Sequence, residues 1–194
     1  MSRPATNSSC AGFTLIEVLI ASILAAAIAT GVAHLIAIGI DANRAAREQT
    51  VTTMLAASKL EQLRSLSWTF EPGSDVPPPQ RSDVSADLSV EPAGSGGPGL
   101  SPAPPGTLES NVRWYVDYLD GQGRWVGNGA APPGNAAFVR RWSVRPLPDD
   151  PASTLILSVL VTTVGQDRSR AGAWTARSGT ESLFVTFITR KGRQ

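Results

Sequence analysis

The 194-residue chain is poor in the side chains that most enzymes use for nucleophilic and metal chemistry. It contains one cysteine, Cys10, and one histidine, His34. A single cysteine excludes an internal disulfide and a cysteine-rich zinc site. His34 lies inside a long apolar run, so the more polar part of the chain can build neither a Ser/His/Asp set nor a Cys/His dyad. We therefore expect no catalytic residue, no cofactor, no metal site and no enzymatic activity.

The aspartates near predicted turns do not suggest a ligand set. Their order lacks the alternation of an EF-hand calcium loop. Turn formation and solvation explain them better. These residues are Asp117, Asp120, Asp149 and Asp150.

Positive and negative side chains nearly balance along the chain. Lys and Arg number 17, Asp and Glu number 16, and the net charge is +1 without any basic block. A nucleic acid partner would require a basic surface, so we expect none. The length suits one globular domain with an additional segment.

Glu17 is the only charged residue between Phe13 and Ile40. A helix over residues 13–40 would be about 42 Å long, against roughly 30 Å for the hydrocarbon core of a bilayer. The segment is apolar on all sides, which favours a membrane-spanning helix over a helix in a soluble core. The alternative is a secretory signal cleaved at Ala27–Ala29, but Glu17 and the apolar sequence that follows argue against it.

The apolar segment contains no Lys or Arg, so a cation for Glu17 must come from elsewhere, or the acid must stay protonated. The sequence GFTLIE, Gly12 to Glu17, followed by the apolar run, resembles the signal of type IV prepilins and pseudopilins. The resemblance implies that a prepilin peptidase cuts between Gly12 and Phe13 and methylates the new amino terminus of Phe13. It also implies that Glu17 pairs with the terminal amine of a neighbouring subunit, which rewards correct register between subunits.

The resemblance further implies a location and a set of partners. Residues 1–12 would be the leader peptide, and the helix would hold a single-pass protein in the inner membrane with its globular domain in the periplasm. The partners would be other pilin or pseudopilin subunits, the prepilin peptidase and the assembly platform of a type II secretion pseudopilus or a type IV pilus, into whose filament the subunit is extracted. The stretch LAASKLEQLRSLSW is similar to PilV-like and GspI-like minor subunits. The alternative function is a secreted or membrane-anchored periplasmic binding domain with an ordinary signal or anchor.

Residues 41–70 continue the helical pattern as an amphipathic half. The apolar stripe consists of Ala56, Leu60 and Leu63, widened by Met54, Ala57 and Leu66. The charged residues of this half, including Lys59, are expected on its solvated faces. His34 stands where many major pilins have a helix-loosening proline, so we expect a straighter helix.

Residues 71–110 are rich in proline and glycine, which predicts a long surface loop without a packed core. A short edge strand is expected at 87–90. Residues 111–194 alternate apolar runs and turns, which predicts a domain built on a three- to four-stranded antiparallel sheet. The resemblance implies that this domain is periplasmic. The amphipathic helix would cover this sheet and give an α+β fold that resembles the pilin fold.

The strands of this sheet follow from the apolar runs. They are expected at 112–119, 124–126, 138–145, 154–164 and 182–190. The third should end at Pro146, and the most apolar, 154–164, should be central. Trp114 and Trp142 are expected in the packing of the sheet, and Trp125 and Trp174 at contacts with another subunit.

Overall fold

The computed structural model describes residues 12–70, 80–169 and 180–190. These residues form one long helix, α1 (Leu15–Ser65), one short helix, α2 (Val164–Ser169), and strands β1 to β9. The chain divides into two compact units, Met1–Arg44 and Ala45–Gln194.

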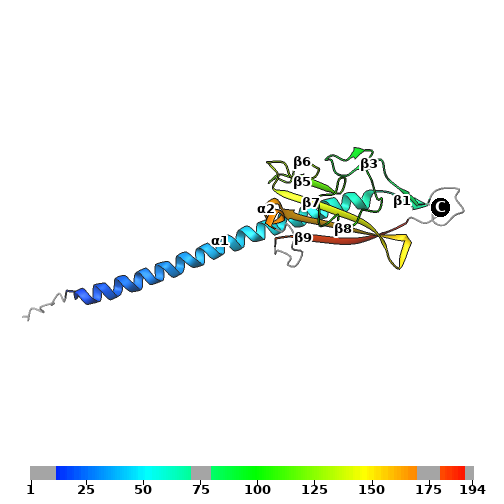
Figure 1. Ribbon diagram of the computed structural model, residues 1–194. Helices are drawn as coiled ribbons and strands as arrows, with labels where there is room; N and C mark the ends of the chain where they lie inside the picture. The colour runs from blue at the N-terminus through cyan, green and yellow to red at the C-terminus, as the bar shows by residue number, and fades with distance from the viewer. Residues whose placement is uncertain (1–11, 71–79, 170–179, 191–194) are drawn as a thin grey trace, which may run out of the picture. The chain divides into compact units, whose positions relative to one another are not determined.

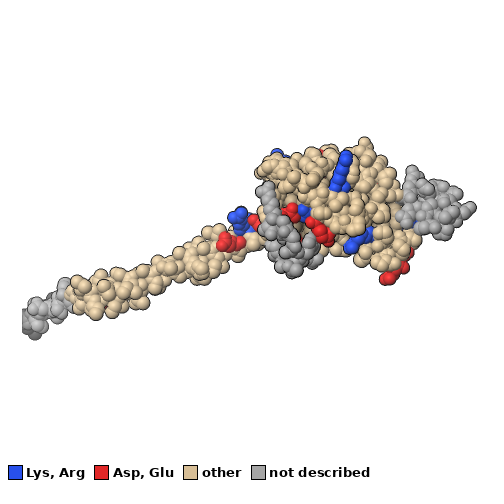
Figure 2. Space-filling view, in the orientation of Figure 1, with Lys and Arg blue, Asp and Glu red and all other residues tan. Residues whose placement is uncertain are grey.

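In the first unit, every described residue is exposed. α1 passes His34 without interruption (Figure 1), in keeping with a segment that contains no proline. Residues 18–40 contain no Lys, Arg, Asp or Glu, and Figure 2 shows this stretch without blue or red atoms on the visible face.

In the second unit, one face of α1 is buried. Its buried residues are Thr52, Ala56, Lys59, Leu60 and Leu63, whose spacing follows one side of a helix. The predicted stripe of Ala56, Leu60 and Leu63 is confirmed. Met54 is 67% exposed, because a residue two positions before Ala56 points to a different side of the helix. Lys59 is fully buried, so the prediction that it is solvated was wrong.

α1 ends at Ser65, short of the predicted limit at residue 70. β1 (Trp68–Phe70) pairs antiparallel with β2 (Gln80–Ser82). The backbone of residues 68–70 therefore takes part in a strand ladder and not in the helix.

The main sheet has five strands in the order β6-β5-β7-β8-β9, and all neighbouring pairs are antiparallel (Figure 1). Their bounds are β5 Val116–Leu119, β6 Trp125–Gly127, β7 Phe138–Leu147, β8 Asp150–Thr163 and β9 Ser182–Thr189. A long helix packed on an antiparallel sheet confirms the α+β prediction, with five strands instead of three or four. β8 is the strand predicted to be central; it is interior, but β7 occupies the middle.

β7 continues through Pro146, which was expected to end it. β5 pairs with β7 only as far as Arg141, so β7 beyond this point has a strand partner on one side only, that of β8. On the other side, the Ala103 N–H donates to the Val144 carbonyl at 2.7 Å. The backbone of Pro146, two residues on, faces the same way as that of Val144. The N–H that proline lacks is therefore not needed by β8.

β5 begins at Val116, four residues later than predicted. Trp114 has a φ of 74°, and the Tyr115 N–H donates to the Val112 carbonyl at 3.0 Å. Residues 112–115 therefore form a turn, because a left-handed residue cannot continue a strand.

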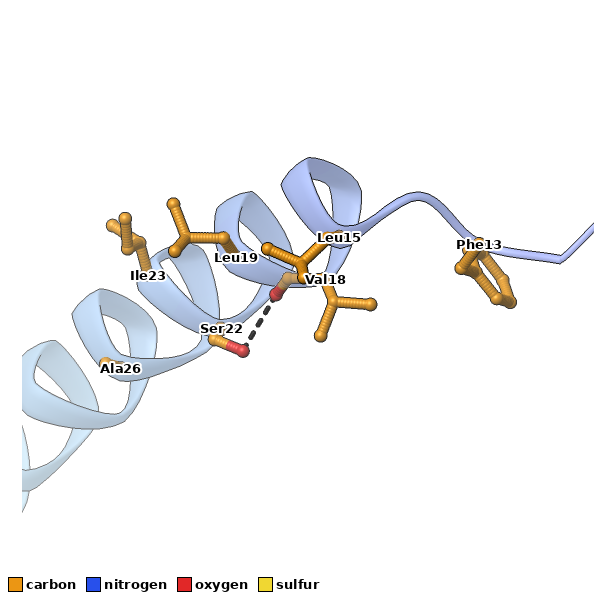
Figure 3. A pocket seen from close by; sticks show the side chains of 7 residues that line it. All are labelled: Phe13, Leu15, Val18, Leu19, Ser22, Ile23 and Ala26. Atoms are coloured by element: carbon orange, nitrogen blue, oxygen red, sulfur yellow. Dashed lines mark hydrogen bonds between the residues drawn. The ribbon is translucent and has the colours of Figure 1, made fainter.

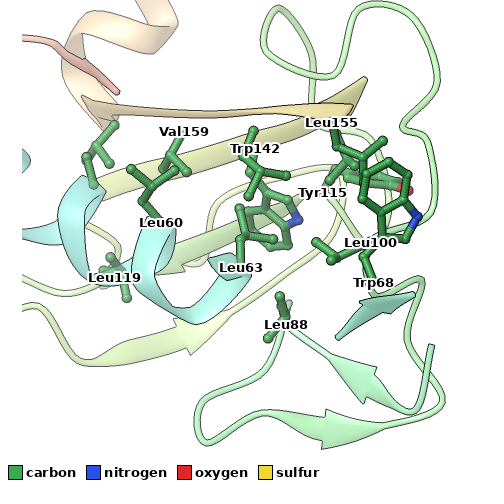
Figure 4. Packing of buried hydrophobic residues seen from close by; sticks show 14 of the residues in the cluster. Leu60, Leu63, Trp68, Leu88, Leu100, Tyr115, Leu119, Trp142, Leu155 and Val159 are labelled. Carbon is green, nitrogen blue, oxygen red and sulfur yellow. The ribbon is translucent and has the colours of Figure 1, made fainter. Parts of the chain in front are cut away.

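The core of the second unit lies between α1 and one face of the main sheet (Figure 4). Leu60 and Leu63 pack there with Trp142 of β7 and Val159 of β8. Trp142 is fully buried, as predicted, and Trp114 packs against the cluster while partly exposed. On the opposite face, Val116, Tyr118 and Val139 pack with Val164 of α2.

The described residues 80–110 also contribute to the core, contrary to the prediction of a surface loop. Leu88 and Leu100 are buried in the same cluster. Gly99 has a φ of 56°, and a Cβ at this position would lie 1.6 Å from the Asp83 carbonyl oxygen. A glycine thus permits two chain segments to approach closely. β3 (Ala86–Asp87) pairs with β4 (Gly94–Ser95), so the strand predicted at 87–90 is present only at its first residue.

Candidate processing and assembly site

Thr14 forms the cap at the start of α1. Its carbonyl accepts hydrogen bonds from the N–H groups of Glu17 at 3.1 Å and Val18 at 3.2 Å. Its Oγ1 accepts a further one from the Glu17 N–H at 3.3 Å. A threonine hydroxyl that accepts from the third helical N–H is the usual N-cap arrangement. Gly12 and Phe13 therefore lie outside the helix, in exposed backbone.

Glu17 is the third residue of α1, and the spacing Thr14-x-x-Glu17 is that of a capping box. Only half of the box is formed, because no hydrogen bond or ion pair to the Glu17 carboxylate is found among the described residues. An acid in the first helical turn is stabilised by the helix dipole. The sequence has no Lys or Arg between Arg3 and Arg44. The carboxylate is therefore exposed without a cation on its own helix within reach.

An apolar surface follows directly on the predicted cleavage site. Phe13, Leu15, Val18, Leu19 and Ile23 all expose more than half of their area, and Phe13 is 82% exposed. Figure 3 shows them at the start of α1. No described residue of the first unit covers this surface.

The hydroxyl groups within the apolar segment are satisfied by the helix itself. Ser22 Oγ donates to the Val18 carbonyl at 2.8 Å (Figure 3), and Thr30 Oγ1 donates to the Ala26 carbonyl at 2.8 Å. A hydroxyl bonded to its own helix carries no unsatisfied donor into an apolar environment.

α1 is long and apolar enough to cross a membrane, by length and composition. A buried core helix and a signal sequence near an amino terminus meet the same criteria. The apolar part of α1 differs from a core helix because none of it is buried.

Residues 7–33 match the family defined by the prokaryotic N-terminal methylation motif. The chain carries a prepilin-type methylation motif. The match includes Gly12, Phe13 and Glu17 and the first half of the apolar run, and it supports the resemblance to type IV pilins and pseudopilins. No curated protein and no solved structure matches the chain.

The methylation motif, together with one apolar helix near the amino terminus, supports a single-pass membrane-anchored protein. Proteins with this motif are structural subunits that are processed by a prepilin peptidase and assemble with other pilin subunits. These statements concern the first 33 residues, because the match ends there.

Beyond the methylation motif, the second unit contains four charged residues in mutual contact, which we call the ion cluster: Lys59, Glu91, Asp117 and Arg140. Lys59 Nζ lies 3.0 Å from Asp117 Oδ2. Arg140 binds Asp117 through two hydrogen bonds, from Nε at 2.9 Å and from Nη2 at 2.7 Å. Arg140 Nη2 also lies 2.8 Å from Glu91 Oε1. The side chains of Lys59 and Asp117 are 0% exposed.

Burial and charge act in opposite directions within the ion cluster. Burial lowers the pKa of Lys59 to about 8, although Asp117 and Glu91 favour its charged form. Burial alone would raise the pKa of Glu91, but a hydrogen bond from Gln62 and the charges of Lys59 and Arg140 outweigh it, so this pKa is lowered. Lys59 also donates to the Leu88 carbonyl and lies 4.3 Å from the centre of the Trp142 ring.

The ion cluster was missed in the sequence, where Lys59 and Asp117 were expected to be solvated. Both positions carried a signal. Lys59 follows Ala56 by three residues and precedes Leu63 by four, which places it on the apolar stripe. Asp117 is in β5, and its partner position in β7 is Arg140. An acid and a base placed opposite each other in neighbouring strands point to the same face of the sheet.

Other predicted positions have mixed outcomes. Asp120 does form a turn, since its Oδ1 accepts from the N–H groups of Gln122 at 2.8 Å and Arg124 at 2.9 Å. Trp125 packs partly buried against the core and donates from Nε1 to the Ser89 carbonyl at 2.9 Å, so its indole N–H is used within the fold. Trp174 lies outside the described residues.

Proposed function

We propose that this protein is a minor pilin or pseudopilin, a structural subunit of a type II secretion pseudopilus or a type IV pilus. It is made as a prepilin with residues 1–12 as its leader. A prepilin peptidase cuts between Gly12 and Phe13 and methylates the amine of Phe13. The observation that carries the proposal is the methylation motif. Within it, Gly12 and Phe13 lie on exposed, non-helical backbone, and the apolar helix that begins at Leu15 is exposed throughout the described part of the first unit.

Glu17 is the assembly residue of this proposal. Its carboxylate has no partner among the described residues, and the sequence has no Lys or Arg between Arg3 and Arg44. Cleavage creates a cation, the amine of Phe13. An ion pair between Glu17 of one subunit and this amine of a neighbour compensates two charges that would each be costly alone in an apolar setting.

The proposed location is the inner membrane, which residues 13–40 cross once, with the globular domain in the periplasm. Residues 41–70, 71–110 and 111–194 follow the membrane segment, and the described residues of all three contribute to one core. Its partners are other pilin or pseudopilin subunits and the assembly platform, and its function is structural and not enzymatic. The similarity of LAASKLEQLRSLSW to PilV-like and GspI-like proteins supports a minor subunit.

Amino-terminal mass spectrometry of the protein from envelopes of the native host tests this proposal. We expect the chain to begin with N-methyl-Phe13. A terminus just after Ala29 would indicate an ordinary secretory signal and a released binding domain, and an intact leader would indicate a simple anchor; either result contradicts the proposal.

A substitution at the cleavage site provides a matched comparison. A Cβ at Gly12 would meet no atom within 4 Å, and the same is true of Gly31. Gly12→Val is therefore expected to leave the fold unchanged but to abolish processing, whereas Gly31→Val should be processed normally. Normal processing of Gly12→Val would contradict cleavage at this bond.

A further inference from the structure

The start of α1 lies two residues after the proposed cleavage bond. Leu15 is the first helical residue, and Thr14 caps it through both its carbonyl and its hydroxyl. The sequence offers other residues of cap type upstream, at Ser8 and Ser9. A helix that began there would include the bond between Gly12 and Phe13. The cap at Thr14 stabilises the helix start at Leu15 relative to such an earlier start.

The cap affects the state of the bond before cleavage. In a continued helix, the Gly12 carbonyl would accept from the N–H of Ile16, four residues on. A peptidase must reach this carbonyl, and a helical hydrogen bond would occupy it. With the cap at Thr14, no hydrogen bond to the Gly12 carbonyl occurs among the described residues, and the backbone of Gly12 and Phe13 is exposed.

The cap also affects the amine after cleavage. Phe13 and Glu17 are four residues apart, and in a continuous helix they would be neighbours on one face. The new amine would then pair with the carboxylate of its own chain. Because the helix begins after Thr14, Phe13 is outside the helical ladder. Glu17 is left for the amine of another subunit.

We propose that Thr14 is a positioning residue. Its cap makes α1 begin after the Gly12–Phe13 bond, so that this bond stays outside the helix and is accessible to the peptidase. This inference rests on the proposed function. Its physical basis is a competition between two helix starts, and a threonine cap contributes about 1 kcal/mol to such a competition. Removal of the cap therefore shifts the ratio of the two starts by about fivefold.

Cleavage kinetics of the full-length chain in detergent micelles, with a purified prepilin peptidase, test the inference. Thr14→Ala and Thr14→Val remove the hydroxyl, and Thr14→Ser keeps it. A substrate that is competent for only part of the time has a reduced apparent affinity, in proportion to the competent fraction. We expect Thr14→Ala and Thr14→Val to raise KM by up to about fivefold with an unchanged kcat. Thr14→Ser should retain the wild-type KM.

A second readout follows the backbone directly. The ¹³Cα chemical shifts of Gly12 and Phe13 should move towards helical values in Thr14→Ala and Thr14→Val but not in Thr14→Ser. The matched control is Thr30→Ala, which removes a hydroxyl that bonds within the same helix to the Ala26 carbonyl. It should change neither KM nor the shifts of Gly12 and Phe13.

Three results would overturn the inference. The first is a wild-type KM for both Thr14→Ala and Thr14→Val. The second is an equal defect in Thr14→Ser, and the third is a fall in kcat alone, which would indicate direct contact between Thr14 and the peptidase. If the wild-type chain itself is not cut, the proposed function fails; if it is cut and the variants behave like it, only the role of Thr14 fails.

Discussion

Lys59 carries an ammonium group into the core of the second unit, where a charge is costly. Its side chain is fully buried, and Asp117 Oδ2 lies 3.0 Å away. The Trp142 ring adds a cation–π contact at 4.3 Å. These contacts offset the loss of hydration only in part, which is why the pKa of Lys59 falls to about 8.

The free energy of unfolding should therefore rise with pH above about 8. Between a folded pKa of about 8 and the ordinary value of 10.5, the unfolded chain binds more protons at Lys59 than the folded chain does. Stability rises with pH wherever this holds. The full difference corresponds to about 3 kcal/mol. Towards high pH the effect is opposed by Tyr115 and Tyr118, because burial raises their pKa values, that of Tyr118 to about 12.

Denaturant unfolding of the full chain in detergent micelles, at intervals from pH 7 to about pH 10, measures this dependence. We expect Lys59→Met to lose the part of the pH dependence that belongs to this residue, while the tyrosine contribution is shared. Lys191→Met, which changes the only other lysine, is the control and should follow the wild type. Parallel curves for wild type and Lys59→Met would contradict a lowered pKa at Lys59.

At the scale of elements, the ion cluster joins α1 to two strands of the main sheet and to the stretch between β3 and β4. Lys59 comes from α1, Asp117 from β5, Arg140 from β7 and Glu91 from the stretch between β3 and β4. Two positive and two negative charges balance within it. Removal of one member leaves a buried charge of the opposite sign without its full counter-charge.

Asp117→Ala should therefore destabilise the second unit strongly. Lys59 and Arg140 would then face each other as two buried cations, with only the half-buried Glu91 near them. We expect a loss of about 3 to 5 kcal/mol in the free energy of unfolding. Glu61→Ala removes an acid from the exposed pair with Arg64 and should cost roughly 0 to 1 kcal/mol. A similar small cost for Asp117→Ala, measured by denaturant unfolding of both variants, would show that the cluster does not stabilise the fold.

The sequence predicted the elements better than their limits and their buried charges. Alternating apolar residues located the strands of the main sheet, and the spacing of Ala56, Leu60 and Leu63 located the buried face of α1. The turn at residues 112–115 was missed, because a left-handed Trp114 has no signature in residue type. The continuation of β7 through Pro146 was not predicted. A proline fits there because β7 has a strand neighbour on one side only at this point, and which strands are neighbours cannot be seen in the local sequence.

At the scale of the whole molecule, the residues proposed for processing and assembly can be named from the sequence alone, and their roles stay predictions. Gly12, Phe13 and Glu17 lie within six residues, so their spacing is visible without a fold. The cap at Thr14 could also have been predicted from the sequence, since Thr14-x-x-Glu17 has the spacing of a capping box. That only half of the box forms depends on side-chain geometry.

Glu17→Ala should separate membrane insertion from assembly. The substitution removes a charge from an apolar helix, so insertion and processing should be at least as efficient as in the wild type. Incorporation into filaments should fall, because the amine of the neighbouring subunit loses its counter-charge. Glu17→Gln, which keeps the shape and removes the charge, should show the same defect. The ratio of filament-bound to membrane-bound protein, measured by immunoblotting after shearing, checks this, and a normal ratio in either variant would exclude the ion pair.

The ion cluster also has a consequence for the order of folding. Its contacts join residues that are far apart in the sequence. Lys59 donates to the Leu88 carbonyl, 29 residues away, and Arg140 binds Asp117 and Glu91 at separations of 23 and 49 residues. A helix docked one turn out of place, about 5.4 Å along its axis, would bury Lys59 away from its acid. The slip would also bring the larger Leu60 to the place of Ala56, so packing and charge both oppose it. The cluster therefore favours one position of α1 in the core, and it completes after the segments that supply it have met.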